Sequence, residues 1–64
     1  MSNPNVEIDN PNVVVQSIEE TSPNRWEVKI RFEETNNNGV FFFTKGTHNG
    51  NGSCGEPFNY KIIW

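Results

Sequence analysis

One segment of the sequence holds the side chains best suited to chemistry. Residues 45–57 combine His48, Cys54 and Glu56 with several glycines and asparagines. A histidine base can activate a cysteine thiolate when a rigid scaffold holds the two groups within hydrogen-bond reach. Here the candidate groups share one Gly-rich segment, which we interpret as a long loop without a helix terminus to stabilise an oxyanion. The sequence therefore favours a protein that is not an enzyme.

Metal and cofactor sites are disfavoured in the same loop. His48 and Cys54 are fewer than the three or four ligands that zinc requires. Oxygen-bearing side chains at alternate positions follow the spacing of a calcium loop, but hard cations prefer carboxylates and Glu56 is the only one there. Residues 50–55 match a G-x-G-x-x-G dinucleotide pattern, yet a strand rather than a helix is expected after them. We expect no metal and no cofactor.

A small-ligand site is the alternative function for this loop. Surface aromatic rings together with the Asn/Gly-rich loop can hold a carbohydrate or a small anion, and the loop's lysine and backbone amides suit an anion. A plain connector between strands is the simpler interpretation. The residues predicted to bind such a ligand are Lys45, His48, Asn49, Asn51 and Ser53.

The composition predicts an all-β domain. The 64 residues include no Leu and no Ala, which are leading helix formers, whereas Val, Ile, Thr and aromatic residues supply the apolar content. Eleven Asn, five Gly and four Pro interrupt every window in which an amphipathic helix might form. One small domain over residues 1–64 is expected, with residues 1–5 as a flexible arm and residues 45–57 as a long loop.

The charge balance restricts the possible partners. The net charge is −3, and the five basic residues are dispersed among acids, whereas nucleic-acid binding needs a clustered Lys/Arg surface. A single-stranded nucleic-acid binder is therefore the least favoured function. No apolar run reaches the roughly 18 residues of a membrane span and no signal peptide is recognisable, so we expect a cytoplasmic protein without a membrane partner. The single cysteine allows no intrachain disulfide.

Residues 25–33 carry the clearest strand signature. Trp26, Val28, Ile30 and Phe32 alternate with charged residues, which predicts one buried face and one wet face. Short turns separate this segment from its neighbours, and we expect an antiparallel five-stranded meander curled into a small barrel or half-sandwich. The other expected strands cover residues 6–8, 13–19, 40–44 and 58–64.

The expected strand at residues 13–19 has a broken pattern. Val13 and Val15 share one face, whereas Val14 and Ile18 share the other. Either both faces of this strand are covered near its start, or a β-bulge shifts the register midway.

The hairpin after residues 25–33 decides which phenylalanine faces outward. Asn38-Gly39 is the preferred pair for a two-residue type I′ turn, and we favour a turn at that position. This turn places Phe41 and Phe43 on the buried face and turns Phe42 outward. A four-residue loop with the opposite register would bury Phe42 instead, because a one-residue slip inverts every side chain.

The outward aromatic surface carries the leading functional hypothesis. A single small core cannot cover two sheet faces, and an exposed apolar patch usually marks an interface. Arg25, Lys29 and Arg31 are expected beside whichever phenylalanine points outward. We therefore expect a non-enzymatic module that binds a protein partner or a second copy of itself as a homodimer. The predicted contact residues are Phe42, Val40, Ile63, Arg31 and Lys29.

Overall fold

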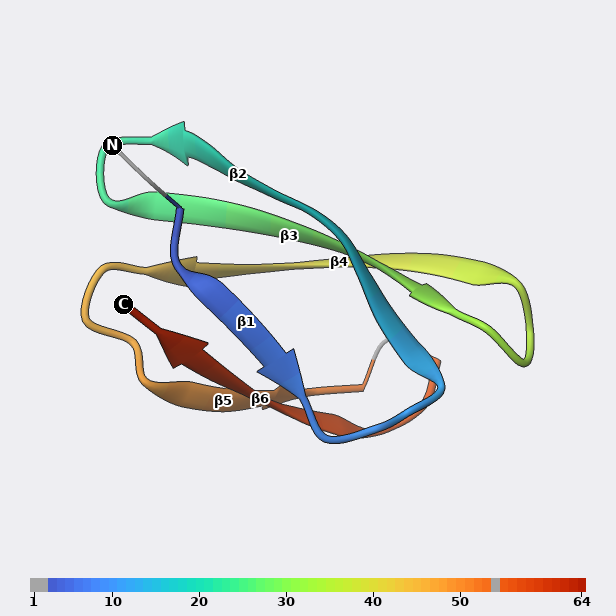
Figure 1. Ribbon diagram of the computed structural model, residues 1–64. Helices are drawn as coiled ribbons and strands as arrows, with labels where there is room; N and C mark the ends of the chain where they lie inside the picture. The colour runs from blue at the N-terminus through green and yellow to red at the C-terminus, as the bar shows by residue number, and fades with distance from the viewer. Residues whose placement is uncertain (1–2, 54) are drawn as a thin grey trace.

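The strands of this protein form two antiparallel sheets that pack face to face (Figure 1). The computed structural model describes residues 3–53 and 55–64, and within them the strand orders are β1-β6-β5 and β2-β3-β4. The predicted all-β class is confirmed, since every element in these residues is a strand. The strands are β1 (Asn5–Ile8), β2 (Val13–Ser22), β3 (Arg25–Phe32), β4 (Asn37–Thr44), β5 (Asn49–Gly52) and β6 (Phe58–Ile63).

The arrangement differs from the predicted meander in strand number, and of the two predicted forms, barrel or half-sandwich, it excludes the closed barrel. The described part of the chain has six strands rather than five, and its sheets form two layers rather than a closed barrel. The first strand pairs with the last, with Asn5 opposite Ile63, so β1 and β2 belong to different sheets. The pairing of β1 with β6 cannot be predicted from local sequence, because turn residues indicate pairing only between strands that follow one another in the chain.

Residues 45–57, predicted as a loop, contain the short strand β5. Its two asparagines point outward and its two glycines point inward, with Gly50 opposite Tyr60 and Gly52 opposite Phe58. A Cβ on these glycines would lie 2.4 Å from Tyr60 Oη and 2.6 Å from Phe58 Cζ. Each aromatic ring therefore covers a glycine, and no side chain fits beneath it. The N-G-N-G alternation of period two was the sequence signal for this strand.

Within the expected arm over residues 1–5, the described residues Asn3 and Pro4 contact the sandwich. Pro4 is buried, and Asn3 Nδ2 donates a hydrogen bond of 2.9 Å to the carbonyl of Ile18. Strand β1 then begins at Asn5. The rest of the expected arm lies outside the described residues.

A bulge in β2 explains its broken pattern. The pairing of β2 with β3 shifts by one residue between Val15 and Ser17. This extra residue moves Ile18 to the inner face that Val13 and Val15 already occupy, where it packs against the core. The bulge interpretation is confirmed.

The turn between β3 and β4 lies earlier than predicted. Asn38 and Gly39 are inside β4, and residues 33–36 make the connection, with Asn36 in the left-handed region at φ 57°. The predicted turn position is therefore wrong. Phe41 and Phe43 nevertheless face inward, as the favoured register required. The connection has four residues, so the expectation that a four-residue loop would bury Phe42 is wrong, because loops of two and four residues leave the same side chains on each face.

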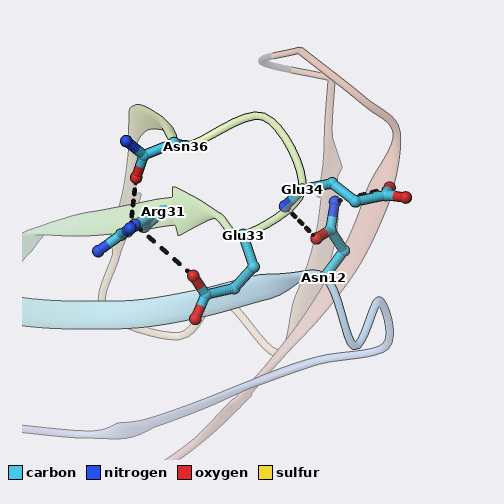
Figure 2. A network of polar contacts seen from close by, with 5 residues as sticks. All are labelled: Asn12, Arg31, Glu33, Glu34 and Asn36. Carbon is cyan, nitrogen blue, oxygen red and sulfur yellow. Dashed lines mark hydrogen bonds and ion pairs between the residues drawn. The ribbon is translucent and has the colours of Figure 1, made fainter.

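Side-chain contacts hold this connection in place (Figure 2). Arg31 Nη2 donates to Asn36 Oδ1, and Arg31 Nε lies 3.6 Å from Glu33 Oε2. From the opposite side, Asn12 Oδ1 accepts a hydrogen bond of 2.7 Å from the backbone N–H of Glu34. These contacts include a partner 22 residues away in the chain. They stabilise a turn that the local Asn-Gly preference does not predict.

The core lies between the sheets and is largely aromatic. Phe41 of β4 stacks on Tyr60 of β6 with ring centroids 4.4 Å apart. At one end of the sandwich, Trp26 meets Trp64 edge to face at 5.0 Å. The alternating strand predicted from residues 25–33 is confirmed as the central strand of the core. Its most deeply buried side chains are Val28, Ile30 and Phe32.

We predict that Gly52→Ala destabilises the protein by about 1–3 kcal/mol through overpacking. The new methyl group would force Phe58 aside, and the Phe58 ring is itself confined by Phe32 and Phe41 at 6.2 and 5.8 Å. Urea unfolding measures the effect. Asn49→Ala, which changes an outward side chain of the same strand, should stay within about 0.5 kcal/mol of the natural protein. Equal stability of the two variants would contradict the ring-over-glycine packing.

The position of the β3–β4 turn gives a second prediction. Asn36→Ala should lower the free energy of unfolding by about 1 kcal/mol, because alanine resists the left-handed backbone. Asn36→Gly should recover the backbone part of this loss, since glycine accepts that backbone freely, but not the part due to the lost contact with Arg31. Asn38→Ala serves as the control and should change stability by less than about 0.5 kcal/mol. A larger cost at Asn38 than at Asn36 in the same denaturation series would place the turn elsewhere.

Candidate functional site

The outer surface of β2-β3-β4 combines exposed apolar side chains with charges. In the β3–β4 ladder, Glu27 lies opposite Phe42 and Lys29 lies opposite Val40. Val14, Val40 and Phe42 remain 40%, 41% and 44% exposed. We call this surface the mixed face. It is defined by Val14, Glu19, Arg25, Glu27, Lys29, Val40 and Phe42.

Arg25 contacts the ring of Phe42, the phenylalanine of the mixed face. Its guanidinium carbon lies 4.9 Å from the centroid of the Phe42 ring, which is a cation–π contact. Such a contact contributes about 0.5–1 kcal/mol at an exposed site and limits the orientations of both side chains. Phe42 is thus presented in a defined position beside a positive charge.

Three of the predicted contact residues share the mixed face, namely Phe42, Val40 and Lys29. Arg31 points to the same side of β3, but Glu33 and Asn36 hold its guanidinium in the adjoining turn (Figure 2). Arg31 therefore stabilises the hairpin in this structure.

Ile63 does not join this surface. In β6 the neighbouring Ile62 points into the core, so Ile63 points away from it and is 38% exposed. It lies on the outer side of β1-β6-β5, with the sandwich between it and Phe42. Ile63 and Phe42 therefore lie on opposite outer surfaces of the described structure.

Away from Ile63, the outer surface of β1-β6-β5 is mostly polar where β5 meets the start of β6. Asn51 of β5 lies opposite Asn59 of β6, and the backbone N–H of Asp9 extends the row by donating 3.1 Å to the Asn59 carbonyl. These side chains border a surface hollow between the turn after β1 and the end of β5. We call this surface the amide face. It is defined by Asp9, Asn49, Asn51, Ser53 and Asn59.

Hydrogen bonds from Asn59 fix the carboxylate of Asp9 at one end of this row. The backbone N–H of Asn59 donates to Asp9 Oδ1 at 2.9 Å, and Asn59 Nδ2 donates to Oδ2 at 3.0 Å. The backbone bond, followed by the side-chain bond, holds the pKa of Asp9 below its ordinary value of 3.8. Asp9 is therefore ionised at neutral pH and has a fixed orientation.

The structure separates the predicted ligand-binding residues of the 45–57 segment. Asn51 and Ser53 line the hollow, and Asn49 lies on the same face two residues earlier. His48 is exposed just before β5. Lys45 lies in the turn after β4, where its backbone N–H bonds to the turn between β2 and β3, so it is not part of the amide face.

Two residues of the amide face were missed by sequence reasoning. Asp9 follows Ile8 in a segment interpreted only as a turn, whereas Asn59 alternates with Phe58 and Tyr60 in the last strand. The outward position of Asn59 was predictable from this alternation. Its proximity to Asp9 was not, because it depends on the pairing of β1 with β6.

Glu56 has a structural role in the fold. Its Oε1 and Oε2 accept hydrogen bonds from Asn10 Nδ2 at 2.6 Å and Asn12 Nδ2 at 2.9 Å. The carboxylate thereby ties the loop before β6 to the turn between β1 and β2. Cys54, the other partner considered for nucleophilic chemistry, lies outside the described residues. Over residues 3–53 and 55–64, no three His, Cys, Asp or Glu side chains are grouped as metal ligands would be.

Comparisons of the chain with protein-family models, with curated proteins and with solved structures found no match. The two outer surfaces therefore provide the basis for a functional proposal. In the part of the chain that the structure describes, no helix has the length and apolar character needed to cross a membrane.

The Asp9 contacts predict an acid-dependent loss of stability. Because the folded pKa of Asp9 is lowered, its contribution is complete above the ordinary value of 3.8 and is lost as the pH falls through the folded pKa. Asp9→Asn should therefore be less stable than the natural protein at about pH 6, with the difference shrinking toward about pH 2. Urea midpoints measured across this range test the prediction. A difference that stays constant with pH would show that ionisation of Asp9 is not involved.

Proposed function

We propose that this chain is a non-enzymatic binding module that acts by protein–protein contact and self-associates through the mixed face. The observation that supports this proposal is the pair of exposed side chains Val40 and Phe42, two residues apart on the outward side of β4, with exposed Val14 on the same sheet surface beyond β3. Adjacent apolar side chains on an otherwise charged surface are typical of interfaces. The oriented Phe42 ring suits the role of a central contact residue, because aromatic residues dominate binding energy at interfaces.

The charges of the mixed face favour a second copy as the partner. Arg25 and Lys29 provide positive charge, and Glu19 and Glu27 provide negative charge on the same surface. A two-fold axis brings the same surface of each protomer together, so a cation of one copy can lie opposite an acid of the other. Such an arrangement contributes mainly to orientation and specificity.

The size of the chain supports the same proposal. Its core is small, and chains below about 70–80 residues often gain stability from oligomerisation. The principal extents of 33 and 18 Å limit each face to about 600 Å². A dimer therefore buries at most about 1,200 Å² in total. This area lies at the lower end for specific interfaces, and we expect a weak dimer with Kd in the micromolar range or above.

Phe42→Ser tests the proposed dimer. We predict that sedimentation equilibrium from about 10 µM to 1 mM shows a monomer–dimer equilibrium for the natural chain, weakened at least about tenfold by this substitution. Ile63→Ser is the matched control, because it removes an apolar side chain of similar exposure from the opposite face. Its dimerisation constant should be unchanged.

Two results would contradict this proposal. One is a natural chain that stays monomeric over the whole concentration range. The other is a dimer that Ile63→Ser disrupts and Phe42→Ser leaves intact, because the interface would then lie on the other sheet. Circular dichroism of both variants separates loss of association from loss of the fold.

A further inference from the structure

The hollow of the amide face collects hydrogen-bonding groups from three separate segments. Asp9 comes from the end of β1, Asn59 from β6, and Asn51 with Ser53 from β5 and the residue that follows it. The strand pairing that brings them together fixes their spacing, since Asn51 lies directly opposite Asn59. A site built on paired strands holds its groups more rigidly than one built on a single loop.

These groups retain hydrogen-bonding capacity. Each carboxylate oxygen of Asp9 accepts one hydrogen bond from Asn59, and a carboxylate offers about four acceptor positions in all. Within the described residues, the side chains of Asn51 and Ser53 form no hydrogen bond to another protein group, and Asn59 Oδ1 accepts none. The hollow thus presents an oriented acceptor, two amides and a hydroxyl that can each bind a ligand.

The charge of the hollow argues against an anion. Asp9 is ionised at neutral pH, since its ordinary pKa of 3.8 already lies far below that pH and the bonds from Asn59 lower it further. Lys61 lies one row away, opposite Glu7 and Asn49 rather than in the hollow. A phosphate or sulfate would therefore meet a fixed negative charge without a cation among the described residues that line the site.

A divalent cation fits the hollow poorly as well. Calcium is bound by six to eight oxygen ligands, usually including several carboxylates. Asp9 is the only acidic residue among the described residues that line the hollow, and both of its oxygens already accept hydrogen bonds from Asn59. A neutral ligand rich in hydroxyl groups matches this site better, because each hydroxyl can donate to the carboxylate and accept from an amide.

The walls of the hollow suit the same class of ligand. Pro11 and Pro57 border the polar row and are exposed. Their rings offer apolar surface to the C–H groups of a pyranose while its hydroxyls face the amides. We propose that the hollow of the amide face is a carbohydrate-binding site, in which Asp9 accepts from two sugar hydroxyls and Asn51 and Asn59 complete the contacts. This site is independent of the dimer surface, which lies on the other sheet.

Amide chemical-shift titration of the full chain tests this site. The probes are glucose, galactose, mannose and N-acetylglucosamine, each added to about 100 mM because small exposed polar sites bind in the millimolar range. At least one sugar should shift the resonances of Asn51, Gly52 and Asn59 in a saturable manner. Inorganic phosphate and calcium, added separately, should leave them unchanged.

Variants connect the shifts to the hollow. Asn51→Ala should weaken sugar binding at least about tenfold, because it removes a donor and an acceptor from the site. Asn49→Ala, on the same strand and face outside the hollow, should bind as the natural chain does. Asp9→Asn should also weaken binding. If Asp9→Asn folds poorly, Asn51→Ala still tests the site, because Asn51 is exposed and its side chain forms no hydrogen bond within the described residues.

Three results would overturn the carbohydrate site. The first is that none of the four sugars shifts the resonances of the hollow. The second is that phosphate or calcium, rather than a sugar, shifts these resonances in a saturable manner. The third is that Asn51→Ala binds sugar as tightly as the natural chain does. Phe42→Ser should bind sugar normally, so failure of the dimer and failure of the sugar site are distinguished in the same set of proteins.

Discussion

The packing of aromatic rings from β6 against glycine backbone joins the two sheets of this protein. Tyr60 and Phe58 lie over Gly50 and Gly52 of β5 on one side. On the other side they meet Phe41 of β4, with centroids at 4.4 and 5.8 Å. Because β5 contributes no side chain to the interior, the rings can occupy the space between the layers. This contact also keeps β5 paired with β6, and the outward asparagines of β5 depend on that pairing for their position.

The sandwich presents two unlike outer surfaces because β3 and β6 alternate in different ways. The outward residues of β3 are charged and lie beside Val40 and Phe42 of β4, whereas those of β5 and the start of β6 are mostly amides. The two surfaces lie back to back and share no residue. A protein partner on the mixed face and a small ligand on the amide face can therefore bind at the same time without direct contact.

Much of the fold follows from local pattern, and the departures have physical causes. The alternation of residues 25–33 gives the central strand, and the absence of Leu and Ala gives the all-β class. The turn after β3 was predicted at the wrong position because side-chain contacts hold residues 33–36 in the turn. Arg31 bonds to the Asn36 side chain, and Asn12 accepts a bond from the backbone of Glu34, which is 22 residues away in the sequence. The local preference of Asn-Gly for turns contains no information on either contact. The bulge in β2 was one of two alternatives that the sequence allowed. At the candidate sites, Phe42 and Val40 were identifiable from register, but Asp9 and Asn59 meet only through the pairing of β1 with β6.

That pairing also affects the order in which the structure can form. Hairpins join β2 to β3 and β3 to β4, whereas β1 finds its partner more than 50 residues later in the chain. Contacts of such long sequence separation form late, because closing a large loop costs entropy before any contact is gained. During synthesis, β2-β3-β4 can assemble before β6 is made, with its inner aromatic face still open to solvent. Rapid arrival of the last strand therefore protects the growing chain from aggregation.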